Sequence, residues 1–96
     1  MVLTKDYSLT VGTTAVQAYP QLTQGNLHFL RIFNTHASNT IWCSRAAGVT
    51  AAANALSCFS IGPGLYELWV APGPIPINAL SIISTGASTN VTIEIG

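Results

Sequence analysis

The sequence LHFLRIFNTHASNTIWCSR, from Leu27 to Arg45, contains two apolar runs of strand length on either side of a cluster of turn-forming residues. This order predicts a β-hairpin. Side chains alternate between the two faces of a strand, so each arm presents two distinct sets. The first arm has Leu30 and Ile32 on one face and Phe29, Arg31 and Phe33 on the other, and the second has Ile41 and Cys43 opposite Trp42 and Ser44.

Both faces of this predicted hairpin are partly apolar. A strand with one face on the core and the other in water alternates more cleanly between apolar and polar side chains. We therefore expect something besides the protein's own core to cover the second face.

The length of the chain and its low charge content bound the possible functions. Its 96 residues predict one small domain over residues 1–96, with a core of modest size. Only 6% of the residues are charged, against roughly 25% in a typical soluble protein, and the formal net charge is zero. So few charges favour a protein that buries much of its surface in an assembly. The alternative is a monomeric β domain rich in Ser, Thr and Asn, kept soluble by neutral polar groups.

The same charge deficit argues against partners that require charge. Nucleic-acid binding needs a basic patch, and the only basic residues besides histidine are Lys5, Arg31 and Arg45, widely spaced. No apolar run is long enough for a transmembrane helix, and the N-terminal residues lack the apolar segment of a signal peptide. We therefore expect a protein made in a cytoplasm, without a nucleic-acid or membrane partner. In that reducing compartment Cys43 and Cys58 are expected to be free thiols, although a disulfide between them is sterically conceivable.

The rest of the chain alternates short strands with turns. Strands are expected over residues 5–11, 15–18, 56–61, 65–70, 80–84 and 89–95. Residues 19–26 are expected to form a surface connection, 46–55 a loop with at most one helical turn, and 71–76, rich in proline, an extended connection or a sheet edge. Pro63 and Gly64 stand in the order of a type II turn. Seven or eight short strands without a convincing helix predict an all-β fold, an antiparallel β-sandwich of the jelly-roll kind.

Alternation within these strands predicts the core. In residues 65–70, Tyr66, Leu68 and Val70 share one face, which we expect to be buried, whereas Glu67 and Trp69 share the other. The expected core consists of Leu30, Ile32, Ile41, Tyr66, Leu68, Val70, Leu80, Ile82, Val91, Ile93 and Ile95.

Three segments carry a resemblance to a known family. LRIFNTHASNTIW (30–42), IGPGLYEL (61–68) and LSIISTGA (80–87), with a closing VTIE strand, resemble the small jelly-roll virion proteins of tailed bacteriophages. The resemblance covers about residues 27–96. It implies a cement, decoration or other accessory structural role on a capsid or tail. The implied form is a symmetric homo-oligomer, with a trimer favoured, that binds a major capsid or other virion protein and is assembled in the host cytoplasm.

No catalytic or metal-binding pattern is recognisable. The candidate metal ligands lack the Cys-x-x-Cys or His-x-x-x-His spacing of a metal site: His28, His36, Cys43 and Cys58. Of the three acidic residues, Glu67 and Glu94 are expected to pair with Arg31 or Arg45, and the third is Asp6. We therefore expect no enzyme activity, no cofactor and no metal.

The aromatic side chains outside the expected core have three interpretations: a second apolar core, a subunit interface, or a platform on which sugars stack. We expect an interface with Trp69 as its main anchor. Its expected members are Phe29, Arg31, Phe33, Trp42, Glu67 and Trp69. The second interpretation of function is a lectin-like, carbohydrate-binding module, because jelly rolls also serve as lectin scaffolds.

Overall fold

The computed structural model describes residues 5–22, 27–46 and 48–96, and within these ranges the chain forms strands and turns but no helix. The all-β expectation is therefore confirmed. The described strands are β1 (Lys5–Asp6), β2 (Leu9–Val11), β3 (Val16–Gln17), β4 (Phe29–Asn34), β5 (Ile41–Ser44), β6 (Cys58–Ile61), β7 (Tyr66–Val70), β8 (Ser81–Ser84) and β9 (Thr89–Ile95).

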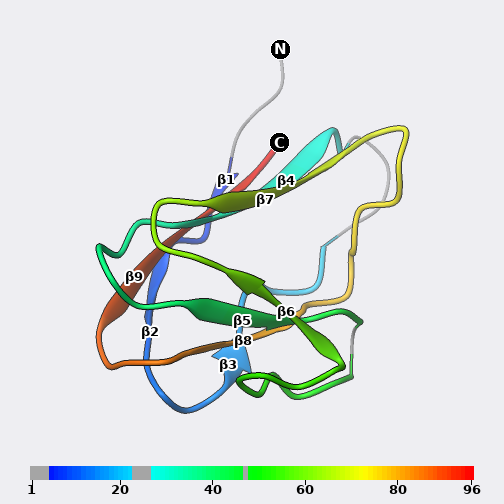
Figure 1. Ribbon diagram of the computed structural model, residues 1–96. Coiled ribbons are helices and arrows are strands. Elements are labelled where there is room, and N and C mark those ends of the chain that lie inside the picture. Colours follow the sequence, from blue (N-terminus) through cyan, green and yellow to red (C-terminus); the bar gives the residue numbers. More distant parts are fainter. Residues whose placement is uncertain (1–4, 23–26, 47) are drawn as a thin grey trace.

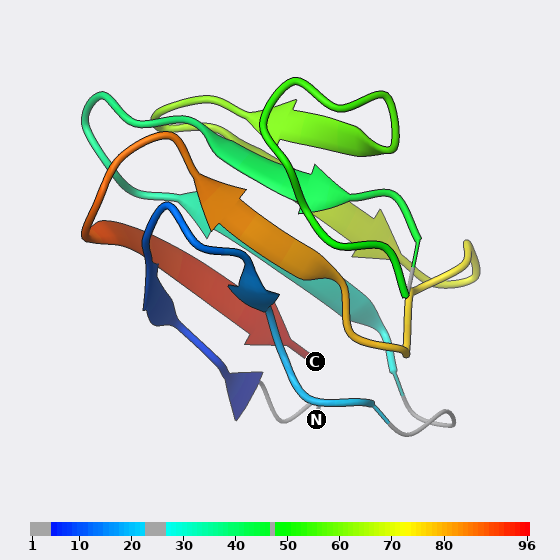
Figure 2. The same ribbon diagram turned by 90° about the horizontal axis from the view of Figure 1, so that it is seen from below.

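The strands form two antiparallel sheets that stack face to face around one core (Figure 1). One sheet has five strands in the order β1-β9-β4-β7, with β2 also paired to β9, and the other has the order β3-β8-β5-β6. Seen from below, the four-stranded sheet lies in front of the five-stranded one, with the strands running in similar directions (Figure 2). The arrangement is that of a β-sandwich.

The strand pairs are nested. β5 pairs with β6, β4 with β7, β3 with β8 and β2 with β9. The chain from β2 to β9 is therefore one long antiparallel hairpin, and successive pairs lie alternately in the two sheets. Further pairing of β4 with β9 and of β5 with β8 completes each sheet.

The hairpin predicted over residues 27–45 is wrong, because β4 and β5 lie in different sheets. Residues 35–40 cross from one sheet to the other, so that Ile32 of β4 and Ile41 of β5 both belong to the core between the sheets. Asn34, at the end of β4, is buried and donates hydrogen bonds to the carbonyl groups of Asn39 and Ile61. A hairpin and a connection that crosses between sheets bury the same alternate residues of both strands. The alternation of apolar residues in the sequence therefore does not distinguish the two.

Most of the predicted core is buried. The residues that confirm the prediction are Leu30, Ile32, Ile41, Leu80, Ile82, Val91, Ile93 and Ile95. Tyr66, Leu68 and Val70 contradict it, because they are 55%, 43% and 52% exposed. The face of β7 that was predicted to be buried therefore points away from the core, and the opposite face points toward it. Trp69 lies opposite Leu30 in the strand register and packs against the core.

Of two connecting segments, the one over residues 19–26 differs from the prediction and the turn at Pro63 and Gly64 agrees with it. Tyr19 and Leu22 are buried, contrary to the surface connection expected for residues 19–26, and the Tyr19 hydroxyl donates to the Pro76 carbonyl at 2.8 Å. Residues 23–26 of that connection lie outside the described residues. The type II turn is confirmed, since Gly64 has a φ of 73° and the Leu65 N–H donates to the Gly62 carbonyl at 3.1 Å.

Candidate interaction surface

The side of the five-stranded sheet that faces away from the core exposes a continuous set of apolar side chains on β4 and β7. The strand register places Phe29 beside Val70, and Phe33 beside Tyr66. The rings of Phe33 and Tyr66 have centroids 6.2 Å apart. We call this surface the outer patch, and its members are Phe29, Arg31, Phe33, Tyr66, Leu68 and Val70. A solvated sheet face would carry mostly polar residues, so this face is suited to contact with another surface.

Arg31 lies at the centre of the outer patch with its charge neutralised. One guanidinium nitrogen is 2.5 Å from a carboxylate oxygen of Glu94 on β9, which confirms one of the ion pairs expected from the sequence. The guanidinium also lies over the rings of Phe33 and Tyr66, 5.3 Å and 5.7 Å from their centroids. The patch therefore combines aromatic rings and aliphatic side chains with a cation already paired and stacked.

The residues predicted to form an interface do not lie on one surface. Phe29, Arg31 and Phe33 belong to the outer patch, but Trp42 lies on the outer side of the four-stranded sheet, between Ser60 and Ile83 in the register. A common surface containing all of the predicted interface residues is therefore ruled out by the two-sheet arrangement.

Glu67 and Trp69 lie on the inward side of β7, because they pair with the buried Ile32 and Leu30. Trp69 is thus not an anchor on the outer face, which corrects the sequence prediction. The residues that take its place there are Tyr66, Leu68 and Val70. The strand sequence YELWV offers no signal for this choice, since both of its faces carry apolar side chains.

A hollow of about 370 Å³ opens between β6 and β7, which are edge strands of the two sheets. We call this side of the molecule the open side of the sandwich. It is lined by Arg45, Phe59, Ser60, Glu67 and Trp69. The rings of Phe59 and Trp69 meet edge to face, with centroids 6.0 Å apart. A neighbouring hollow of about 260 Å³ shares Arg45 and Trp69 with it. This side of the molecule thus brings a cation, a carboxylate and two aromatic rings together.

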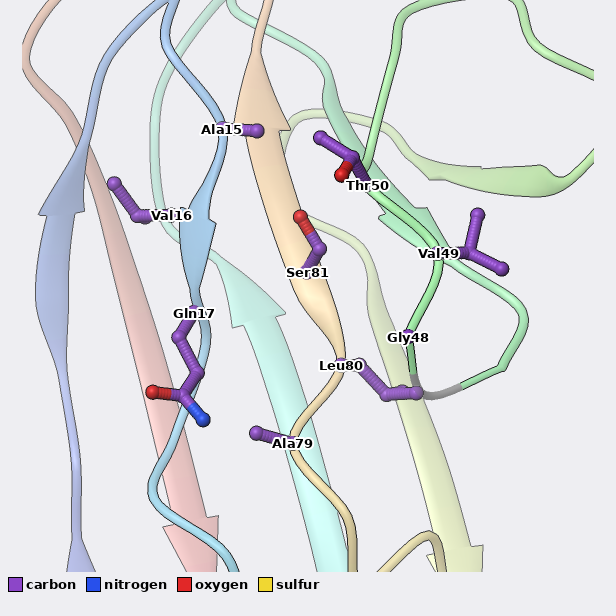
Figure 3. Close-up of a pocket in the computed structure, with 9 residues that line it drawn as sticks. All are labelled: Ala15, Val16, Gln17, Gly48, Val49, Thr50, Ala79, Leu80 and Ser81. Carbon is purple, nitrogen blue, oxygen red and sulfur yellow. The ribbon is translucent and has the colours of Figure 1, made fainter.

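A third hollow, of about 320 Å³, lies between β3 and the loop that contains residues 48–50 (Figure 3). Val16 and Gln17 stand on one side, and Ala79 to Ser81 lie between them and the loop (Figure 3). The Ser81 hydroxyl accepts a hydrogen bond from the Ala51 N–H at 2.9 Å and so ties the loop to β8. No ionisable side chain lines this hollow, so its own residues supply no acid–base chemistry.

Two of the three acidic residues, Asp6 and Glu94, already have polar partners. Asp6 and Glu94 lie opposite each other on β1 and β9. The hydroxyl and the N–H of Ser8 both donate to Asp6 and lower its pKa, so Asp6 is poorly suited to act as a general acid. Glu94 is held by Arg31. Among the described residues, no group of three or more His, Cys, Asp or Glu side chains could hold a metal ion.

Cys43 and Cys58 are both buried and free. Cys43 lies opposite Phe59, and Cys58 opposite Ser44, so the two thiols project from opposite faces of the four-stranded sheet. This placement is incompatible with a disulfide between them. Burial, followed by the neighbouring Cys58 and Glu67, raises the pKa of Cys43 to about 12. Cys43 is therefore an unreactive thiol at neutral pH.

No protein-family model, curated protein or solved structure matches this chain. Over the ranges that the structure describes, no helix is long and apolar enough to cross a membrane. The resemblance to bacteriophage virion proteins stays a prediction.

Proposed function

We propose that this chain is a non-enzymatic structural protein of a virus particle, most simply a bacteriophage capsid cement or decoration protein, that works as a homo-oligomer. The observation that carries the proposal is the outer patch, an apolar sheet face with a neutralised arginine at its centre. The trimeric state and the contact with a major capsid or other virion protein belong to the same proposal.

The strand order supports a jelly-roll assignment. The nested pairs β2 with β9, β3 with β8, β4 with β7 and β5 with β6 are those of eight strands wrapped as one long hairpin into two sheets. Jelly rolls are frequent among viral capsid proteins and lectins. This assignment therefore favours the same two function classes as the sequence.

The chemistry of the outer patch supports binding to protein. Tyrosine and arginine are enriched among the residues that dominate binding energy, and the patch offers Tyr66 and Arg31 with Phe29 and Phe33 around them. Because Glu94 already neutralises Arg31, covering the patch does not leave an unpaired cation. A typical interface removes about 800 Å² from each partner, so the six residues of the patch would supply the centre of such a contact.

The test is Phe33→Ser, which removes one of the aromatic rings of the patch. We expect a smaller species than the wild type in light scattering at tens of micromolar, with the far-ultraviolet β signature unchanged. Leu56→Ser is the matched control, because Leu56 is 97% exposed and lies outside the patch. A wild-type protein that is already a monodisperse monomer under these conditions would contradict the self-association.

A second candidate function is carbohydrate binding, and the hollow between β6 and β7 favours it. Trp69 supplies an aromatic ring, and Glu67, Arg45 and Ser60 supply polar groups for sugar hydroxyls. A glycan-array signal that Glu67→Gln removes would favour this function over the structural one.

A further inference from the structure

The edge strands of the two sheets differ in how well they are protected against pairing with another chain. β1 and β3 have two residues each, and β1 carries Lys5 and Asp6. Short length, charged residues, proline and bulges are the usual means of protecting a sheet edge. β7 is longer, with five residues; it contains no proline, its register with β4 is unbroken, and its one charged residue is Glu67.

Alternation along the ladder identifies the unpaired backbone groups of β7. The Asn34 N–H donates to the Leu65 carbonyl at one end, and the Ala71 N–H donates to the His28 carbonyl at the other. Between these bonded pairs, every second residue of β7 directs its N–H and C=O toward β4, namely Glu67 and Trp69. Tyr66, Leu68 and Val70 therefore direct theirs to the open edge, where β7 has no partner strand in the described part of the chain.

We propose that β7 pairs edge to edge with β7 of a second copy, antiparallel, about a twofold axis at Leu68. This inference rests on the proposed self-association and adds to it a contact between two copies, which is separate from the contacts within a trimer. Leu68 lies opposite Leu68 of the second copy, and Tyr66 lies opposite Val70. The contact is isologous, so each backbone group at the edge meets its complement from the same strand.

The side chains of β7 fit this register on both faces. On the outer face, apolar side chains meet apolar side chains: Tyr66 beside Val70, and Leu68 beside Leu68. On the inner face Glu67 lies opposite Trp69, so no two like charges are directly opposed. The twofold axis runs along the sheet normal and places both outer patches on the same side. The pair therefore presents one larger apolar surface to a further partner.

The hollow between β6 and β7 supports a second copy as the occupant of this edge. It adjoins the inward side of β7, where Glu67 and Trp69 of the second copy would enter. Arg45 lines the hollow and makes no ion pair with the residues that the structure describes. Its charge is thus available to Glu67 of the second copy, which gives the contact electrostatic complementarity.

Cysteine cross-linking of Leu68→Cys tests the register directly. The Cα atoms of a hydrogen-bonded antiparallel pair are about 5.5 Å apart, which lies in the range for a disulfide. We expect mild oxidation to give a covalent dimer that a reductant reverses, whereas the wild type, with both of its cysteines buried, gives none. Leu56→Cys, at a 97% exposed position, is the control for random collision. Cross-linking of Leu68→Cys no faster than that of Leu56→Cys would overturn the proposal.

Leu68→Pro and Leu68→Ala separate the backbone contribution from that of the side chain. Proline removes the N–H that points to the open edge, and an edge strand tolerates this without losing a bond to β4. Light scattering should then show Leu68→Ala paired and Leu68→Pro unpaired, with the same circular dichroism. Equal pairing in the two variants would overturn the edge contact.

The two proposals fail in different ways. If Phe33→Ser reduces the size of the oligomer while Leu68→Cys gives no specific dimer, the edge contact is wrong and the outer patch stands. If Leu68→Cys cross-links specifically while Phe33→Ser changes nothing, the edge contact stands and the outer patch does not mediate self-association.

Discussion

At the scale of single residues, Asn34 shows how a polar side chain stabilises the end of this sandwich. It is fully buried, and its amide nitrogen donates to the carbonyl groups of Asn39 at 2.8 Å and Ile61 at 2.9 Å. Its carbonyl oxygen accepts from the N–H of His36 at 3.0 Å. One side chain thus joins the end of β4, the connection that crosses between the sheets, and the end of β6. Because its donors and its acceptor are all used, its burial carries little desolvation penalty.

Replacing Asn34 with alanine should destabilise the protein severely. Asn34→Ala leaves the buried Ile61 carbonyl, the part-buried Asn39 carbonyl and the His36 N–H without their partner, and an unsatisfied buried group costs about 1–3 kcal/mol. We expect the free energy of unfolding to fall by about 2–5 kcal/mol in urea titrations at fixed protein concentration. Asn78→Ala, at an exposed position, is the control and should change it by less than about 0.5 kcal/mol. Equal stability of the two variants would show that Asn34 does not hold the crossing connection.

Cys43 makes stability depend on pH in the alkaline range. Its pKa is raised from 9.0 to about 12 by burial, then by Cys58 and Glu67. Above pH 9 the unfolded chain loses this proton while the folded chain keeps it, so stability falls as pH rises from about 9 toward 12.

The expected loss approaches about 1.4 kcal/mol per pH unit within that window. Urea midpoints measured from pH 8.5 to 10.5 should show this slope, and Cys43→Ala should flatten it. Burial also raises the pKa of Tyr19, which adds to the loss at higher pH and remains in the variant. An unchanged slope in Cys43→Ala would rule out Cys43 as its source.

At the scale of elements, the orientation of β7 is decided by what covers each of its faces. Trp69 packs against the core and meets Phe59 at the open side of the sandwich. Its large ring buries more apolar area there than Leu68 could. Glu67 shares the inward face but stays exposed, because β7 is an edge strand and its side chain reaches solvent. An interior strand would not tolerate an unpaired carboxylate in that position.

This orientation predicts opposite results for neighbouring substitutions. Trp69→Ala should lower the free energy of unfolding by about 2–4 kcal/mol, because it opens a cavity beside the core. Leu68→Ala should cost less than about 1 kcal/mol, because that side chain is 43% exposed on the outer face. Thermal or urea unfolding of both variants provides the measurement. A larger loss for Leu68→Ala than for Trp69→Ala would mean that β7 faces the other way.

At the scale of the whole molecule, three independent features favour assembly. Charged residues make up only 6% of the chain. In the described part of the chain an apolar sheet face is left uncovered, and β7 offers an edge without a partner strand next to that face. A domain of this size is marginally stable alone, and binding to further copies would stabilise the folded state by mass action.

The sequence alone determined the features that depend on near neighbours. These are the all-β class, the places of most strands, the turn at Pro63 and Gly64, and the buried faces of β4, β5, β8 and β9. The reason is that two-residue alternation and turn chemistry act over a few positions and are read without knowing what each strand pairs with.

Only the tertiary structure decided which strands became neighbours, and with them the candidate site. A hairpin and a crossing connection after Asn34 bury the same side chains, and the two faces of β7 are both apolar, so the local sequence is consistent with either outcome. The choice came from pairing with distant segments: β4 with β7 and β9, and β5 with β6 and β8. The outer patch exists because that pairing places Tyr66, Leu68 and Val70 beside Phe29, Arg31 and Phe33 and leaves Trp69 facing the core.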